Sequence, residues 1–150
     1  MSNTYERILV AIDGSYESEL AFEKGMHAAL RNGAELILAH VVDTRSLQSV
    51  ATFDNYVYDR MEQESKDVLA SYEKIARENG LEKIKTVIEF GNPTSMLAVD
   101  IPEKENVDLI MVGATGMNTF ERLFVGSTSE YILRHTKVDL LVVRDANKTL

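Results

Sequence analysis

Five apolar runs rich in β-branched residues recur along the chain, and helical patterns separate them. The runs are Arg7 to Ile12, Glu35 to Val42, Ile84 to Phe90, Val107 to Val112 and Val138 to Val143. Alternating strands and helices form right-handed crossovers, which place helices on both faces of a mostly parallel sheet. The pattern predicts a single-domain α/β fold. We expect an open, doubly wound, five-stranded parallel sheet of order 3-2-1-4-5, which is a Rossmann-like arrangement.

Helix signals lie between these runs. Ser15 is the expected N-cap of the first helix, and Gly33 is its expected end. The apolar spacing from Met61 to Ala76 predicts a second helix that stops at Asn79-Gly80. Small residues on the first helix indicate close packing on the sheet.

Two segments are less regular. Asn92-Pro93 is expected to open a third helix, and Pro102 removes one backbone donor there, so we expect a kink or an end at Pro102. Asp43 to Tyr56 has no clean period. We expect a loop or an imperfect helical entry there, which would form a lid beside the carboxyl edge of the sheet.

The length, cysteine content and net charge of the chain exclude some classes of function and disfavour others. The 150 residues form one expected domain, 1-150, which is long enough to bury a core without disulfides. The chain has no cysteine, which excludes thiolate catalysis and fits a cytoplasmic protein. A net charge of −8 disfavours nucleic acid and anionic membranes. No apolar run approaches the length of a membrane helix, and no signal peptide is evident.

The segment after the fourth run favours a phosphate ligand. Gly113-Ala114-Thr115-Gly116 follows the apolar run directly, and Gly126-Ser127-Thr128-Ser129 follows after nine intervening residues. The pattern from Glu130 to His135 predicts a helix, and we expect its first residues to lie near Ser127. Glycines allow backbone to approach oxygen atoms, and a helix N-terminus offers unpaired N–H groups. The alternatives are ordinary turn glycines and a cluster of N-cap hydroxyls.

The topology brings a second segment to the same place. Ligands of open α/β sheets bind beyond the carboxyl ends of the strands where the winding reverses, here between strands one and four. Strand one ends at Ala11-Ile12-Asp13-Gly14-Ser15, and strand four ends at Gly113. Asp13 would accept a hydrogen bond from an adenine amino group or a ribose hydroxyl, unless it only caps the first helix. His40-Val41-Val42 would cover the base. The three histidines form no metal-ligand pattern.

These motifs together resemble the ATP-binding branch of the universal stress protein family. That branch carries G-x2-G-x9-G-[S/T], and Gly113, Gly116, Gly126 and Ser127 satisfy every position. The resemblance implies that Asp13 and Val41 contact adenine. It implies that Gly113 and Gly116 contact the ribose and the α/β-phosphates, and that three residues contact the distal phosphates: Gly126, Ser127 and Thr128. The remaining expected binding residues flank these positions: Ala11, Gly14, Ser15, Thr115 and Ser129.

The resemblance also implies a function. We expect an ATP-binding stress-response regulator with slow or no hydrolysis, because the motif lacks the lysine of a P-loop. Mg²⁺ or Mn²⁺ would be carried by the phosphates, and no catalytic residue or protein metal site is expected. Family members dimerise through the last strand, here Val138 to Val143, and the protein partners are unknown. The alternatives are a weak ATPase, an autophosphorylating phosphotransferase that uses Ser127, Thr128 or Ser129, and a dimeric interaction module without nucleotide.

Overall fold

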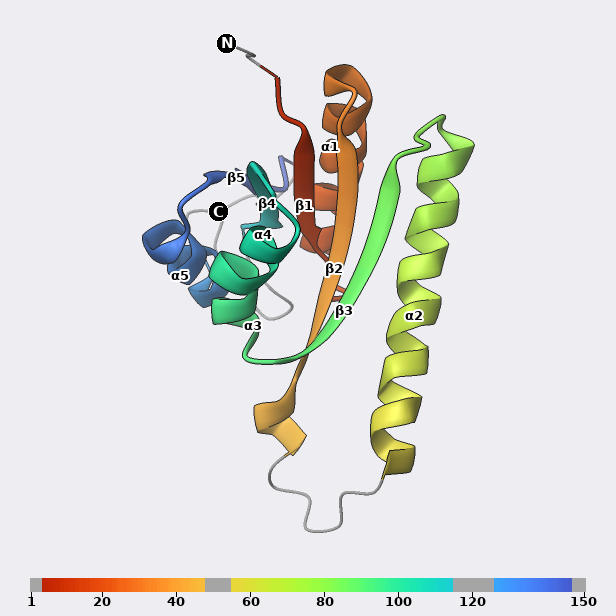
Figure 1. Cartoon of the computed structure of the whole chain (residues 1–150), viewed down its shortest axis with the longest axis vertical. Helices are drawn as coiled ribbons and strands as arrows, with labels where there is room; N and C mark the ends of the chain where they lie inside the picture. Colours follow the sequence, from red (N-terminus) through yellow and green to blue (C-terminus); the bar gives the residue numbers. More distant parts are fainter. Residues whose placement is uncertain (1–3, 48–54, 115–125, 147–150) are drawn as a thin grey trace.

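The sheet has the predicted number and order of strands. The computed structural model describes residues 4–47, 55–114 and 126–146 (Figure 1). The strands are β1 (Arg7–Ala11), β2 (Glu35–Asp43), β3 (Ile84–Gly91), β4 (Leu109–Gly113) and β5 (Asp139–Val143). All pairings are parallel, in the order β3-β2-β1-β4-β5, which confirms the predicted fold class.

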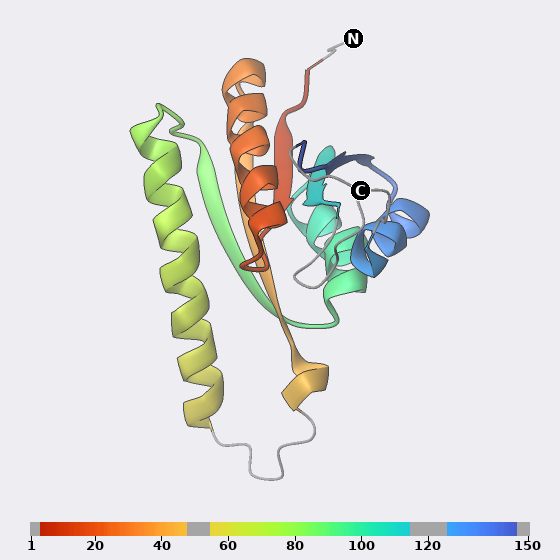
Figure 2. The ribbon, with the colours of Figure 1, turned by 180° about the vertical axis from the view of Figure 1, so that it is seen from behind.

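Helices cover both faces of this sheet. The near face in Figure 2 carries α1 (Tyr16–Asn32) and α2 (Asn55–Glu78). The opposite face carries α3 (Pro93–Ser95), α4 (Ile101–Lys104) and α5 (Ser127–His135), as Figure 1 shows. In the described ranges, no helix is both long enough and apolar enough to cross a bilayer.

The strands are apolar on both faces because both faces are covered. On β1, Ile8 and Val10 belong to the core layer beneath α1 and α2, whereas Leu9 belongs to the layer beneath α4 and α5. All three side chains are fully buried. Neighbouring residues of a strand point to opposite faces, so a near-continuous apolar run is typical of a central parallel strand.

Most of the predicted helix ends are confirmed. The Ser15 side chain accepts a hydrogen bond from the Ser18 N–H, and Gly33 closes α1 in the left-handed conformation, with φ +65°. Asn92 caps α3 through its side chain, with Pro93 in the first turn. These caps pair backbone groups that a helix end leaves without intrahelical partners.

The third helix does not end at Pro102, because helical residues continue to Lys104, but its α-helical pattern is interrupted just before this proline. A π turn, η2 (Met96–Asp100), joins α3 to α4, and the Ile101 N–H bonds to the Met96 carbonyl. An α-helical proline clashes with the carbonyl four residues earlier. The wider turn lies just ahead of Pro102 and accommodates the missing donor.

The segment Asp43 to Tyr56 is more ordered at its two ends than the sequence predicts. Strand β2 extends through Asp43, and a 3₁₀ turn, η1 (Thr44–Leu47), follows it. Helix α2 begins at Asn55, which is earlier than the apolar spacing from Met61 indicates. The predicted lid lies largely outside the described residues.

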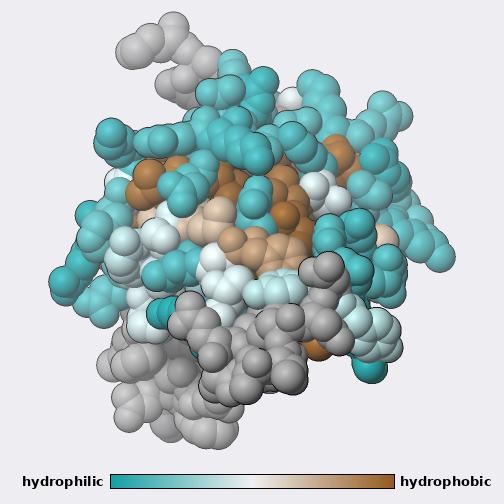
Figure 3. Space-filling model, turned by 60° about the horizontal axis from the view of Figure 1, so that its bottom comes forward, coloured by the Kyte–Doolittle hydropathy of each residue, from teal (hydrophilic) through white to brown (hydrophobic). Residues whose placement is uncertain are grey.

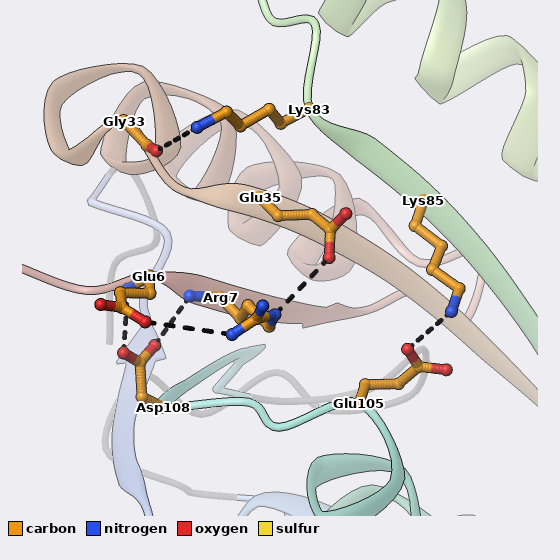
Figure 4. A network of polar contacts seen from close by, with 8 residues as sticks. All are labelled: Glu6, Arg7, Gly33, Glu35, Lys83, Lys85, Glu105 and Asp108. Carbon is orange, nitrogen blue, oxygen red and sulfur yellow. Dashed lines mark hydrogen bonds and ion pairs between the residues drawn. The ribbon is translucent and has the colours of Figure 1, made fainter.

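Side chains tie the strands together at the amino edge of the sheet (Figure 4). The Asp108 carboxylate, just before β4, accepts from the Glu6 N–H at 2.8 Å and the Arg7 N–H at 3.0 Å. Lys85 on β3 pairs with Glu105 at 2.7 Å. Exposed ion pairs contribute little stability, but the Asp108 bonds fix the alignment of β1 and β4 at this edge.

Helix α1 packs unusually close to the sheet at Gly25. A methyl group on Gly25 would lie 2.5 Å from Cγ2 of Val10, which is fully buried. Such a contact forces either the helix or the strand to move. Small residues on this helix therefore permit the close packing that the sequence predicts.

Replacing Gly25 with alanine tests this packing. We expect Gly25→Ala to lower the free energy of unfolding by about 1–2 kcal/mol, because overpacking outweighs the gain in helix propensity. Urea denaturation measures the change. In the double variant with Val10→Ala the loss should be smaller than the sum of the single losses. A more stable Gly25→Ala single variant would contradict the close contact.

Candidate functional site

The loop after β1 is held by the side chain of Asp13. Oδ1 of Asp13 accepts from the Ser15 N–H at 2.9 Å and from the Ser15 hydroxyl at 2.5 Å. Oδ2 has no partner among the described residues, and the Asp13 side chain is exposed. Gly14 has φ +85°, a conformation that L side chains rarely adopt. Asp13 therefore orders the loop with one oxygen and presents the other to solvent.

Ser15 and Ala11 have structural positions at this end of β1. The Ser15 hydroxyl is buried and is used by Asp13 and by the Ser18 N–H. Ala11 is the last residue of β1, is paired with Ala39, and packs against the layer beneath α4 and α5. Ser15 is buried and Ala11 is half-buried.

His40 on β2 is fixed beside the same loop. Its Nδ1 lies 2.8 Å from the Ile12 carbonyl oxygen. Because a carbonyl only accepts, Nδ1 carries the proton in this bond. The bond to a backbone carbonyl explains the position of this half-buried histidine without a metal. Within the described ranges, no three His, Cys, Asp or Glu side chains are grouped to hold an ion.

A pocket of about 400 Å³ lies beside the loop, between the ends of β1 and β2 and the middle of α2. Its lining comprises Ile12, Asp13, Gly14, His40, Val41, Val42, Asp43, Met61, Glu64, Ser65, Val68 and Leu69. The predicted residues Asp13, Gly14 and Val41 therefore share one cavity. With the bottom of the molecule turned forward, Figure 3 shows a group of apolar side chains bordered above and at the sides by hydrophilic ones.

The contribution of α2 to this pocket was not predicted. The spacing from Met61 to Ala76 predicts a helix without placing it at a ligand site, yet Glu64 and Ser65 line the cavity. Asp43 at its rim is bound by Arg45, with Nη2 to Oδ2 at 2.8 Å, and this side-chain bond lowers the pKa of Asp43. The polar residues inside an otherwise apolar stripe were the available signal for this wall.

The second part of the site lies where β4 ends. Gly113 packs so closely on α1 that a methyl group there would lie 2.7 Å from Cβ of Glu17. The Gly126 N–H donates to the Ala114 carbonyl at 2.7 Å. These contacts place the start of α5 directly at the end of β4. Close approach, rather than positive φ, explains the glycine at position 113.

The first turn of α5 carries the predicted hydroxyl residues. Gly126 is its N-cap and makes no side-chain cap bond, so the interpretation of the hydroxyls as an N-cap cluster is wrong. Ser127 is exposed and Thr128 is half-buried. Ser129 is 3% exposed, and its hydroxyl donates to the Gly113 carbonyl at 2.9 Å. Ser129 thus anchors α5 to β4.

The two parts meet at the reversal of winding. Strands β1 and β4 are paired neighbours, and α1 and α5 leave them on opposite faces of the sheet. The loop at Asp13 and the N-terminus of α5 therefore border one edge. Thr115 and Gly116 lie outside the described residues, so the middle of the glycine motif remains a prediction.

The anchor between Ser129 and Gly113 can be tested by stability. We expect Ser129→Ala to lower the free energy of unfolding by about 1 kcal/mol, because the half-buried Gly113 carbonyl loses a donor. Ser127→Ala is the matched control, since Ser127 is exposed, and should change stability by less than about 0.5 kcal/mol. Equal effects of both changes in urea denaturation would contradict the anchoring role.

Comparison with known proteins agrees with this architecture. The model of the universal stress protein family matches residues 4–144. A putative universal stress protein of Staphylococcus saprophyticus is 40% identical over 141 residues, which cover 94% of this chain and 84% of the relative. The solved structure of hypothetical protein MJ0577 is 29% identical, with a TM-score of 0.85, and the match covers 96% of this chain and 99% of that one.

Two more distant solved structures share the fold and carry ligands. A universal stress protein in complex with cAMP is 24% identical, with a TM-score of 0.67, over 95% of this chain and 98% of that one. A universal stress protein family protein from Arabidopsis thaliana with AMP bound is 16% identical, with a TM-score of 0.66, over 97% and 95%. From the family match across nearly its whole length, this chain belongs to the universal stress protein family.

Proposed function

We propose that the protein is an ATP-binding regulator whose nucleotide lies across the carboxyl ends of β1 and β4. The observation that carries this proposal is the pairing of two different surfaces at one edge. A pocket of about 400 Å³ with apolar walls borders Asp13, and a helix N-terminus stands at the end of β4. The first suits a purine base and the second suits phosphate.

The base would occupy the pocket. Oδ2 of Asp13 is available to accept from an adenine amino group or a ribose hydroxyl, because Oδ1 is used by Ser15. Val41, 9% exposed, would pack on the ring. Gly14 would let the backbone approach the ligand, while Ala11 and Ser15 support the loop. The family structures with cAMP and AMP support an adenine nucleotide.

The phosphates would lie against α5. Gly126, Ser127 and Thr128 stand in its first turn, where N–H groups lack intrahelical partners. Gly113, Thr115 and Gly116 would contact the ribose and inner phosphates by family resemblance. Ser129 would act indirectly, because its hydroxyl is bound to Gly113. Mg²⁺ or Mn²⁺ would be carried mainly by phosphate oxygens and water.

Binding, rather than turnover, is the proposed activity. A phosphotransferase that used Ser127 or Thr128 would need a base to activate the hydroxyl. Among the described residues, neither hydroxyl is hydrogen-bonded to a carboxylate or a histidine. This supports slow hydrolysis at most. The absence of cysteine fits a cytoplasmic location, and the protein partners would read the bound nucleotide.

We also propose a homodimer through the last strand. The expected segment Val138 to Val143 contains β5, which ends the sheet, and Leu141 on it is 40% exposed. An apolar edge strand is prone to pair with another chain. Pairing with the β5 of a second copy would cover the open side of β5 in each of the two copies.

Two substitutions test the proposed contacts with the nucleotide. Gly126 has φ −63° and ψ 160°, which valine tolerates, so Gly126→Val adds bulk without backbone strain and should abolish ATP binding. Asp13→Asn keeps an oxygen for Ser15 but replaces an acceptor with a donor, and should weaken binding by about 1–3 kcal/mol. Isothermal titration with Mg-ATP measures both.

The control for Asp13 is Ser15→Ala, which removes the cap of α1 but leaves the free carboxylate oxygen. It should lower stability by about 1 kcal/mol and weaken ATP binding less than Asp13→Asn. Unchanged affinity in Asp13→Asn would limit Asp13 to its loop role. Unchanged affinity in Gly126→Val would place the phosphates elsewhere.

The dimer has its own test. We expect Leu141→Arg to shift the protein from dimer to monomer in sedimentation equilibrium, because a charge would be buried in the paired edge. Leu133→Arg is the matched control, since Leu133 is 64% exposed on α5. A wild-type monomer, or a dimer that survives Leu141→Arg, would exclude this interface.

A further inference from the structure

A second cavity lies between α1 and α2, on the outer side of the helical layer. It has a volume of about 370 Å³, and eight residues line it: Glu19, Phe22, Glu23, Met26, His27, Tyr72, Ile75 and Asn79. Figure 2 shows the two helices on the near face of the sheet. We call this cavity the α1–α2 groove. Neither the loop at Asp13, nor the first turn of α5, nor β5 contributes to its lining.

The floor of the α1–α2 groove is apolar. The rings of Phe22 and Tyr72 meet edge to face with their centroids 4.8 Å apart, and so bridge the two helices. Met26 is buried next to them. Ile75 is 45% exposed, which leaves a large apolar side chain at the mouth of the groove. An occupant with an apolar face would remove Ile75 from water.

The rim of the groove is acidic. Glu19 and Glu23 stand one turn apart on α1, and no lysine or arginine is among the lining residues. Glu19 and Glu23 line the same cavity as Tyr72, whose pKa is raised by burial and by the carboxylates of Glu19 and Asp13. The chain as a whole carries −8. A second copy would therefore meet repulsion here, whereas a cationic occupant would be attracted.

The walls restrict the form of the occupant. Both walls are α-helices, so their backbone groups are bonded internally and offer no strand edge for β-pairing. From Glu19 to His27 and from Tyr72 to Asn79 the groove follows about two helical turns, or roughly 11 Å. This length matches two turns of a docked helix.

From the apolar floor, the acidic rim and the helical walls, we propose that the α1–α2 groove docks a basic amphipathic helix of a partner protein. Apolar side chains at successive turns of that helix would contact Tyr72 and Ile75, while the buried Phe22 ring supports Tyr72 from within the core. Lysine or arginine side chains beside them would pair with Glu19 and Glu23. This docking does not depend on nucleotide binding.

A model peptide tests the proposal on the full-length protein. The probe is a fluorescein-labelled amphipathic peptide of leucine and lysine, about 14 residues long, so that it can form a helix. Fluorescence anisotropy at physiological ionic strength should show saturable binding. Ile75→Ser and Glu23→Lys should each weaken it about tenfold, and a peptide with glutamate in place of lysine should not bind.

Matched controls separate the groove from general attraction to an acidic protein. Glu103→Lys makes the same charge change on α4, and Leu133→Ser removes an exposed apolar side chain from α5. Both residues lie on the face of the sheet opposite to the α1–α2 groove. Neither should change the affinity by more than about twofold. Circular dichroism checks that every variant is folded, and hydrogen exchange should show peptide-dependent protection in α1 and α2.

Three outcomes would overturn the proposal. One is the absence of saturable binding, and another is equal weakening by the groove variants and their controls. The third is a lower self-association of Ile75→Ser in sedimentation equilibrium without any effect on the peptide. That last result would assign the groove to a second copy of the chain.

Discussion

The close packing of α1 on β1 and β4 is the constraint on which the rest of the structure depends. Two glycines make it possible, because a methyl group would lie 2.5 Å from Val10 at Gly25 and 2.7 Å from Glu17 at Gly113. The first turn of α1 therefore lies directly against the end of β4. As a result, the loop held by Asp13 and the first turn of α5 border the same edge of the sheet.

The amino and carboxyl edges of the sheet differ in the groups that they present. At the amino edge, the Asp108 carboxylate binds the backbone ahead of β1, and ion pairs link neighbouring elements. At the carboxyl edge, a pocket opens beside Asp13, and the start of α5 is bonded to the end of β4 by Gly126 and Ser129. Rigid support at one edge and available polar groups at the other are what a ligand site in a parallel sheet requires.

Local signals made much of this fold predictable, whereas contacts between distant segments were not. The strand order and the caps at Ser15 and Asn92 follow from period, burial and side-chain chemistry near each element. The π turn before Pro102 was not predicted, because a proline indicates that a helix is interrupted but not which turn geometry replaces the lost hydrogen bond. The bond from Ser129 to Gly113 and the pocket wall from Glu64 were missed because both depend on tertiary packing. The described residues of the glycine motif lie at the end of β4 and the start of α5, whereas its central residues Thr115 and Gly116 lie outside the described ranges.

The central claim is that an adenine nucleotide lies across the ends of β1 and β4. The most direct measurement is a crystal structure of the protein with Mg-ATP, under conditions in which calorimetry shows the protein to be saturated. The account predicts that the base lies in the pocket beside Asp13 and Val41 and that the phosphates lie against the first turn of α5. A nucleotide bound anywhere else on the saturated protein, or a reversed orientation with phosphate in the pocket, would contradict it.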